Sequence, residues 1–249
     1  ADPVALASAE ADRRLRSETV RLRAGDVPGA TLSDSTIERN DNAVSLEFGA
    51  ATLNNVRVRN NDGVRTFDVR AFSSLTLSAG EVRDNRGQTV INLADNARLT
   101  VNTTQVQNNS GAALVALNSA VQLTGARFTN QSGDGLSLQG STATLSNVEV
   151  RSHRGLSLRA TSASTVVVTG SRFSDNQTGI AVNASSLTLQ GTEVSSNGEV
   201  GLTVGDAASV SLSDGQIANH TDGGVALGST SHLRLSASEL RANGGVGLS

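Results

Sequence analysis

Residues 75–77 read Leu-Thr-Leu, and similar triplets return as Leu-Thr-Val at 99–101, Leu-Thr-Leu at 187–189 and Val-Ser-Leu at 210–212. The last residue of each triplet belongs to an aliphatic column that recurs every 21 to 24 positions. The column consists of Leu32, Leu53, Leu77, Val101, Leu123, Leu145, Val168, Leu189, Leu212 and Leu235. Such a period is typical of a solenoid. The alternation within each triplet predicts a short strand with one buried and one solvent-exposed face.

Two further series of short apolar segments share this period, so we predict three strands in each coil. The first series precedes the column and has the triplets Val20-Arg21-Leu22, Val44-Ser45-Leu46, Phe67-Asp68-Val69, Ile91-Asn92-Leu93, Val115-Ala116-Leu117, Leu136-Ser137-Leu138, Leu156-Ser157-Leu158, Ile180-Ala181-Val182, Leu202-Thr203-Val204 and Val225-Ala226-Leu227. The third series is centred on Ile37, Val56, Val82, Val106, Phe128, Val148, Phe173, Val194, Ile217 and Leu240. An eleventh coil begins at Gly245 and stops at Ser249, so we expect the chain to be part of a longer protein.

An Asn follows the third strand in nearly every coil. These residues are Asn40, Asn61, Asn85, Asn109, Asn130, Asn176, Asn197, Asn219 and Asn243, with Ser152 in the remaining coil. Asn tolerates the left-handed turn conformation, and its side-chain amide can bond to the copy in the next coil. The repeat therefore predicts an internal asparagine ladder that joins successive coils.

Three short strands per coil, aliphatic columns and an Asn at one turn resemble the right-handed parallel β-helix of pectate-lyase-like proteins. The resemblance covers residues 18 to 249 and implies an all-β, right-handed parallel β-helix of about ten coils. It implies little about activity, because the superfamily includes polysaccharide lyases, hydrolases, epimerases, phage tailspikes, autotransporter passengers and non-catalytic surface proteins. Left-handed β-helices fit less well, because their hexapeptide period is absent.

Residues 1–17 are expected to form an N-terminal capping segment in front of the β-helix. Val4, Leu6, Ala7, Ala11 and Leu15 have helical spacing, which predicts a short helix over residues 3 to 16. Such a helix would cover apolar interior and unpaired strand backbone at the first coil. The alternative is a frayed terminus.

The composition excludes several function classes. The 249 residues carry a formal net charge of −3, contain no Cys, Met, Trp or Tyr, and have Arg at all 20 basic positions. A thiol nucleophile, a disulfide, a lysine Schiff base and a tyrosine acid are therefore excluded in this sequence. The sequence lacks the strongly basic face that would predict nucleic-acid binding, and no apolar run in it approaches the roughly 18 residues of a membrane-spanning helix.

Enzymes that resemble this fold usually work in the groove beside the first strand, so its outward residues are the candidates for a site. Glu47, Asp68, Arg70 and Asn92 come from three successive coils, with Asp68 between Ser45 and Asn92. The resemblance implies carboxylates that hold Ca²⁺ and an Arg that acts as a base. The alternative is a surface ladder in which Arg70 pairs with Glu47 for about 0 to 1 kcal/mol.

Other features argue against sugar chemistry or a metal centre. Polysaccharide sites usually offer aromatic platforms, whereas Phe67, Phe128 and Phe173 occupy inward columns of the predicted core. The Asp-Pro-His-Asp signature of epimerases is absent. His153 and His220 lie about three coils apart, roughly 14 Å by strand spacing, which is too far to share an ion. We predict no metal site, and we expect both histidines, together with His232, on the surface.

The outward face of the second strand carries a file of polar residues that includes Thr31, Thr52, Thr76, Thr100, Thr144 and Thr188. Gln122, Val167, Ser211 and Arg234 occupy the other coils. A regular threonine file resembles the surface of ice-binding solenoids, although Thr also suits any exposed strand. This file is a candidate binding face.

These observations favour a non-catalytic, secreted or cell-surface β-helical rod that serves as an adhesion or structural scaffold. Its partner would be a surface protein or a polysaccharide, and it would need no cofactor. The alternative is a carbohydrate-active enzyme, a polysaccharide lyase or hydrolase, that uses the first-strand groove and Ca²⁺. Ice binding through the threonine file is a further alternative.

Overall fold

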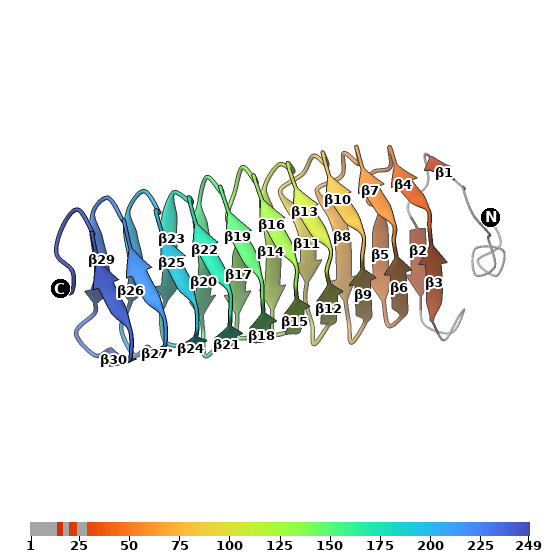
Figure 1. The fold of residues 1–249 in the computed structure, drawn as a ribbon. Helices are drawn as coiled ribbons and strands as arrows, with labels where there is room; N and C mark the ends of the chain where they lie inside the picture. Colours follow the sequence, from red (N-terminus) through yellow and green to blue (C-terminus); the bar gives the residue numbers. More distant parts are fainter. Residues whose placement is uncertain (1–13, 17–19, 24–28) are drawn as a thin grey trace.

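The computed structural model describes residues 14–16, 20–23 and 29–249, and they form a parallel β-solenoid (Figure 1). Three parallel sheets run along its length, and every strand pairs with its equivalents in the neighbouring coils. Within the described residues no helix is present, so none can span a membrane. The predicted fold class, an all-β parallel solenoid of about ten coils, is confirmed.

The sheets are named A, B and C. Sheet A contains β1 (Arg14–Arg16), β4 (Thr36–Glu38), β7 (Arg57–Arg59), β10 (Glu81–Arg83), β13 (Gln105–Gln107), β16 (Arg127–Thr129), β19 (Glu149–Arg151), β22 (Arg172–Ser174), β25 (Glu193–Ser195), β28 (Gln216–Ala218) and β31 (Glu239–Arg241). Sheet B contains β2 (Val20–Arg23), β5 (Val44–Glu47), β8 (Arg65–Arg70), β11 (Thr89–Leu93), β14 (Ala112–Leu117), β17 (Leu136–Gln139), β20 (Leu156–Thr161), β23 (Thr178–Val182), β26 (Val200–Val204) and β29 (Gly223–Leu227). Sheet C contains β3 (Ala30–Ser33), β6 (Ala50–Asn54), β9 (Ser74–Ser78), β12 (Arg98–Asn102), β15 (Ala120–Thr124), β18 (Thr142–Ser146), β21 (Thr165–Thr169), β24 (Ser186–Gln190), β27 (Ser209–Ser213) and β30 (His232–Ser236).

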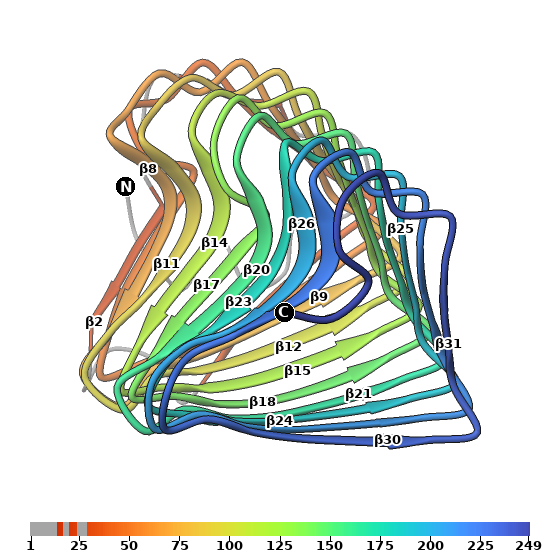
Figure 2. The ribbon, with the colours of Figure 1, turned by 90° about the vertical axis from the view of Figure 1, so that its left-hand side faces the viewer.

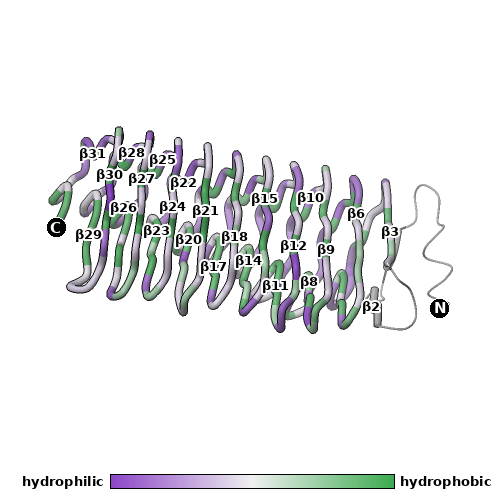
Figure 3. Tube along the Cα trace, turned by 90° about the horizontal axis from the view of Figure 1, so that it is seen from below, coloured by the Kyte–Doolittle hydropathy of each residue, from purple (hydrophilic) through white to green (hydrophobic). Residues whose placement is uncertain are grey.

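Seen along its axis, each coil encloses a core between the three sheets, and sheet C forms a flat side (Figure 2). The aliphatic column of sheet C is in register from coil to coil, as the pairing of Leu77 with Val101 shows. Leu145 near the middle is 1 % exposed, whereas Leu235 in the last sheet C strand is 37 % exposed. Hydrophobic and hydrophilic segments both recur from coil to coil in the coloured part of the chain (Figure 3). The column assignment is therefore confirmed.

The register of sheet B differs from the prediction in two coils. In β14 the inward residues are Leu114 and Ala116, which pair with Ile91 and Leu93, so Leu117 is outward and 38 % exposed. The sequence Ala-Ala-Leu-Val-Ala-Leu is apolar at every position, so it does not indicate which of its residues point into the core. In β20 the inward residues are Leu158 and Ala160 rather than Leu156 and Leu158.

Sheet A differs from the prediction in two coils as well. The central residues of β7 and β19 are Val58 and Val150, which pair with the neighbouring central residues of the sheet. The predicted residues Val56 and Val148 are also buried, but they lie in the turn before each strand. Each of these coils therefore has two buried valines, and only the strand pairing shows which of the two lies in sheet A.

The two ends of the chain bear on the remaining predictions. The capping helix expected over residues 3 to 16 falls mostly outside the described residues, but its last three residues form β1, which pairs with β4. The solenoid therefore includes residues before the predicted boundary at 17. At the other end, the amide of Leu227 donates to the Ser249 carbonyl at 2.9 Å, and Val225 bridges to Leu248. The beginning of the eleventh coil is therefore present.

Candidate functional site

The polar cluster predicted on the first strands lies on the outer face of sheet B. Phe67 and Val69 of β8 point into the core, and this alternation turns Asp68 and Arg70 outward. Asp68 lies between Ser45 and Asn92 in the sheet, as predicted.

Three donors surround the Asp68 carboxylate. Its Oδ1 accepts hydrogen bonds from Arg70 Nε and from Asn92 Nδ2, both at 2.9 Å. Its Oδ2 lies 3.5 Å from a terminal nitrogen of Arg65, and the Asp68 side chain is 15 % exposed. The negative charge is thus shared between two guanidinium groups and an amide.

Glu47, the second predicted carboxylate, is not joined to this network. The strand register places Glu47 beside Arg70, but within the described part of the chain these two residues form no ion pair. The predicted Glu47–Arg70 pair is therefore replaced by an Asp68–Arg70 pair.

The donor set does not fit Ca²⁺. Calcium takes about six to eight oxygen ligands, whereas the cluster offers the carboxylates of Asp68 and Glu47, and Asp68 already interacts with three nitrogen donors. Across the described residues, no three His, Asp or Glu side chains gather where they could hold a metal.

Two exposed aromatic side chains, which the sequence pattern did not predict as site residues, lie beside this cluster along the chain. Phe48 follows Glu47 and is 56 % exposed, while Phe72 lies two residues after Arg70 and is 72 % exposed. Both adopt a positive φ, 55° and 62°, in the turn from sheet B to sheet C. The signal in the sequence was their position one or two residues beyond an outward residue at the end of a strand. In contrast, Phe67, Phe128 and Phe173 are fully buried, as predicted.

The turn that carries Phe72 is held firmly. The amide of Phe72 donates to the Asp95 carbonyl of the next coil at 2.9 Å, and the Ser73 hydroxyl accepts the amide of Gly49 at 3.1 Å. Phe72 lines a shallow hollow together with Asn96, Arg98, Asn118 and Thr142. An exposed ring, several amides and a guanidinium group thus share one side of the solenoid.

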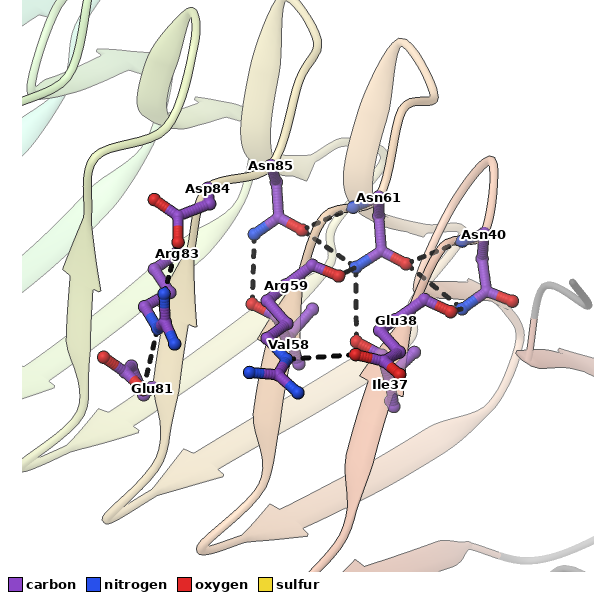
Figure 4. Close-up of polar contacts among 10 residues, drawn as sticks. All are labelled: Ile37, Glu38, Asn40, Val58, Arg59, Asn61, Glu81, Arg83, Asp84 and Asn85. Atoms are coloured by element: carbon purple, nitrogen blue, oxygen red, sulfur yellow. Dashed lines mark hydrogen bonds and ion pairs between the residues drawn. The ribbon is translucent and has the colours of Figure 1, made fainter. Parts of the chain in front are cut away.

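The asparagine ladder is present in the turn from sheet A to sheet B (Figure 4). The amide of Asn61 donates to Asn85 Oδ1 at 3.0 Å, and Asn61 Nδ2 donates to the same oxygen at 2.8 Å. Asn85 repeats both bonds toward Asn109 at 3.0 and 2.9 Å, and its Nδ2 also donates to the Val58 carbonyl at 3.1 Å. Asn61 and Asn85 therefore each bind the coil before and the coil after their own.

Three ladder positions differ from the prediction. Asn130, Ser152 and Asn219 are the turn residues with positive φ, and the next residue in each coil, Gln131, His153 or His220, occupies the ladder. His153 and His220 were expected on the surface, but they are 3 % and 1 % exposed. Their ring nitrogens bond to the backbone of earlier coils, which explains their burial. His232 is exposed, as expected.

Burial changes the titration of both ladder histidines. Desolvation lowers the pKa of His153 to about 4, although its bond to the Phe128 carbonyl and the charge of Asp134 act in the opposite direction. Desolvation also lowers the pKa of His220, against the bonds to Val194 and Asn197. Both imidazoles are therefore neutral near pH 7.

The outer face of sheet A carries many ion pairs. Arg59 Nε lies 3.0 Å from Glu38 Oε2, and Arg83 bonds to Glu81 and Asp84 (Figure 4). Further pairs along this face are Arg127–Glu149, Arg151–Glu149, Arg172–Glu193 and Arg241–Glu239. Most charged side chains on the described part of this face therefore have a partner of opposite sign.

The threonine file lies in register on the outer face of sheet C, as the pairings of Thr52 with Thr76 and of Thr76 with Thr100 show. From β6 to β27, all of them described strands, Arg98 is the sole charged residue on this face. Val167 interrupts the file and is 40 % exposed. Ice binding through this file stays a prediction.

A family model for a right-handed β-helix region matches residues 112–249. A comparison with curated protein sequences gave no match. A crystal structure of a mutant of the periplasmic alginate epimerase AlgG is similar, with a TM-score of 0.67 and 10 % identity, covering 96 % of this chain and 73 % of that chain. The crystal structure of AlgG itself gives a TM-score of 0.58, with the same identity and coverage. At this identity the likeness concerns the fold alone.

Proposed function

Because this chain belongs to the family of right-handed β-helix proteins, we propose that it is an exported, non-catalytic scaffold that binds a polysaccharide along sheet B. The observation that carries the proposal is that an exposed guanidinium group and an exposed aromatic ring lie close together in the chain. Arg70 ends strand β8, and Phe72 lies in the turn that follows it. Aromatic rings offer large apolar faces, and Arg presents several fixed hydrogen-bond donors to hydroxyl or carboxylate groups.

The same geometry favours binding over catalysis. A general base must offer a free lone pair to the proton that it removes. Both oxygens of Asp68 interact with Arg or Asn nitrogens and its side chain is only 15 % exposed, so this carboxylate mainly fixes the guanidinium groups in place. Preorganised donors of this kind reduce the entropy that is lost when a ligand binds.

The solenoid also suits an extended ligand. Successive coils repeat the sheet B surface at a strand spacing of about 4.8 Å. Phe48 and Phe72 occupy the same turn in consecutive coils, so a sugar chain that runs along the axis would meet both rings. Export is supported by the likeness to a periplasmic epimerase and is part of the proposal.

The proposal is tested by measuring binding to neutral and uronate-containing polysaccharides by affinity electrophoresis and calorimetry. We expect Arg70→Ala and Phe72→Ala each to weaken binding about tenfold, which corresponds to about 1.4 kcal/mol. Arg151→Ala on sheet A is the matched control and should leave affinity unchanged. A chain that binds no polysaccharide, or binds equally well without Arg70 and Phe72, would overturn the proposal.

A second candidate function is a carbohydrate-active enzyme that works on sheet B. It is favoured by the likeness to the alginate epimerase over 96 % of the chain and by the exposed carboxylate of Glu47 beside Arg70. The test is product analysis after incubation with polysaccharide, with Ca²⁺ or with a chelator. Turnover that disappears in Glu47→Gln while binding persists would establish the enzyme and replace the non-catalytic scaffold.

A further inference from the structure

Gln131 and His153 make only one of the two ladder bonds, because Gln131 Oε1 and His153 Nδ1 accept none, but each ladder asparagine from Asn61 onward does two tasks. Its side-chain oxygen accepts the backbone amide of the preceding ladder residue, as Asn197 Oδ1 does for Asn176 at 3.0 Å. Its side-chain nitrogen donates to a carbonyl of an earlier coil, as Asn176 Nδ2 does to Val150 at 3.2 Å. An Asn amide has both groups and does not titrate, so a ladder built of Asn works at any ordinary pH.

His220 performs both tasks with its ring. Nδ1 accepts the backbone amide of Asn197 at 3.2 Å, and Nε2 lies 3.1 Å from the Val194 carbonyl, to which it donates. Only the neutral ring with its proton on Nε2 satisfies both bonds. A proton on Nδ1 would face the N–H of Asn197, so the bond between the two coils would be lost.

The imidazole of His220 is tightly packed and has little room to change its rotamer. A Cβ on Gly201 would collide with Cδ2 of His220, so the ring packs directly on the backbone of β26. The methyl group of Ile217 lies against the same space. Glu199 and Asp222 in the flanking turns are exposed, and within the described residues neither forms an ion pair with His220. A charge on this ring would therefore be buried without a counter-ion.

We propose that His220 is an acid-sensitive link between two coils. Its protonation breaks the hydrogen bond from the Asn197 amide to His220 Nδ1 and opens the turn between β28 and β29. Asn at the same position would hold the two coils together regardless of pH. Coils of a solenoid contact only their neighbours, so opening can stay local.

The direction of the pH effect follows from proton linkage. An unfolded or opened His has a pKa of about 6.5, and the closed ring binds protons less readily. The contribution of His220 to closure is therefore complete above about pH 6.5 and decreases as the pH falls. One titrating group weakens closure about tenfold for each pH unit in this window.

The experiment is hydrogen exchange by mass spectrometry at pH 7.5 and pH 5, corrected for the intrinsic exchange rate. In the wild-type chain we expect protection in residues 197–205 and 218–228 to fall on acidification, by at most about tenfold for each pH unit below about 6.5. His220→Asn, which restores the ladder amide, should keep its protection at pH 5. Asn219→Ala, in the exposed residue beside it, should respond to acid as the wild type does.

Two results would overturn the proposal: unchanged protection in the acidified wild type, or an equal loss in His220→Asn. If His220→Asn did not fold, nitrogen NMR of the wild-type imidazole decides. An unprotonated Nδ1 at neutral pH that gains its proton together with the loss of the Asn197 amide bond supports the proposal. Titration without any change at Asn197 contradicts it.

Discussion

Arg70 donates from Nε to Asp68 Oδ1 at 2.9 Å, although the two residues lie on one strand and Arg70 stands beside Glu47 in the sheet. Residues two apart on a strand share a face, so their side chains can meet without leaving the strand. The shared carboxylate holds Arg65 as well, at 3.5 Å, so one aspartate orients two guanidinium groups on the outer face of sheet B.

Replacing Asp68 with Asn should leave those two positive groups without their common counter-ion. We expect Asp68→Asn to lower the free energy of unfolding by about 1 kcal/mol, because the two Arg side chains are 37 % and 41 % exposed and partly screened by solvent. The loss should shrink when salt is added, since salt screens the remaining repulsion. Urea denaturation at two salt concentrations measures this. Asp95→Asn, at an exposed turn, is the control, and an equal effect at both sites would contradict the assignment.

The ladder assignment is tested by comparing neighbouring asparagines. Asn109→Ala removes the oxygen that accepts two bonds from Asn85 and the donor to the Val82 carbonyl. These buried partners would be left unpaired, so we expect a loss of about 2 to 4 kcal/mol in the free energy of unfolding.

Asn108→Ala is the matched variant for the ladder. Asn108 is exposed, has a φ of 54°, and accepts one surface bond from Asn130. We expect it to cost about 1 kcal/mol, mostly from the left-handed conformation. Chemical denaturation of both variants gives the comparison, and the reverse order of stabilities would show that the ladder has been misplaced by one residue.

Much of the fold was predictable because one face of each strand is buried and the period is strict. The columns through Leu77 and Leu145 and the stacking of Asp68 on Asn92 follow from alternation and coil length alone. The prediction failed where alternation carried no phase. In β14 all six residues are apolar, and Val56 and Val58 are both buried, so the pattern was equally compatible with two registers.

The ladder and the candidate site were predictable only in part, for a related reason. Turn residues with positive φ and ladder residues are adjacent, and Asn suits both positions, so Asn219 concealed the role of His220. The partner of Arg70 depends on side-chain rotamers, which periodicity does not specify. Composition indicated a chain poor in aromatic residues, but it did not show that Phe48 and Phe72 are exposed in consecutive coils.

The core column gives a sharper test of the architecture. Leu145 is 1 % exposed in the middle of sheet C, so Leu145→Asp would bury a charge that has no partner. We expect no cooperative unfolding transition and a loss of strand signal in circular dichroism. Thr144→Asp, one residue away on the exposed face, should unfold much as the wild type does. A Leu145→Asp variant that melted like the parent would refute the column.

The ion pairs of sheet A should differ in strength according to burial. The side chain of Glu38 is 4 % exposed where Arg59 meets it, whereas Glu149 is 31 % exposed beside Arg127. We expect Arg59→Met to destabilise the protein by about 2 kcal/mol, because it weakens the compensation of a buried carboxylate. Arg127→Met should cost less than about 1 kcal/mol. Thermal unfolding of the two variants is the measurement, and equal losses would show that burial does not set the strength of these pairs.

The second ladder histidine predicts a pH dependence of global stability. The pKa of His153 is lowered to about 4, chiefly by burial, so in the folded state the ring stays neutral while the unfolded chain takes up a proton below about pH 6.5. The unfolded state therefore binds more protons in this window, and stability falls as the pH falls. The difference of about 2.5 pKa units corresponds to about 3 kcal/mol lost between neutral pH and pH 4.

His153→Asn removes this titration and keeps a side chain that the ladder accepts in other coils, so we expect the free energy of unfolding to depend less on pH. The gain should be largest near pH 4, because there the wild-type ring is costliest to keep neutral. His232→Asn, at an exposed position on β30, is the matched control. Urea unfolding at several pH values between 4 and 7.5 measures the slope. The variant and the wild type differ only at residue 153. If the free energy of unfolding of His153→Asn depended on pH as steeply as that of the wild type, His153 would not be the source of the acid sensitivity.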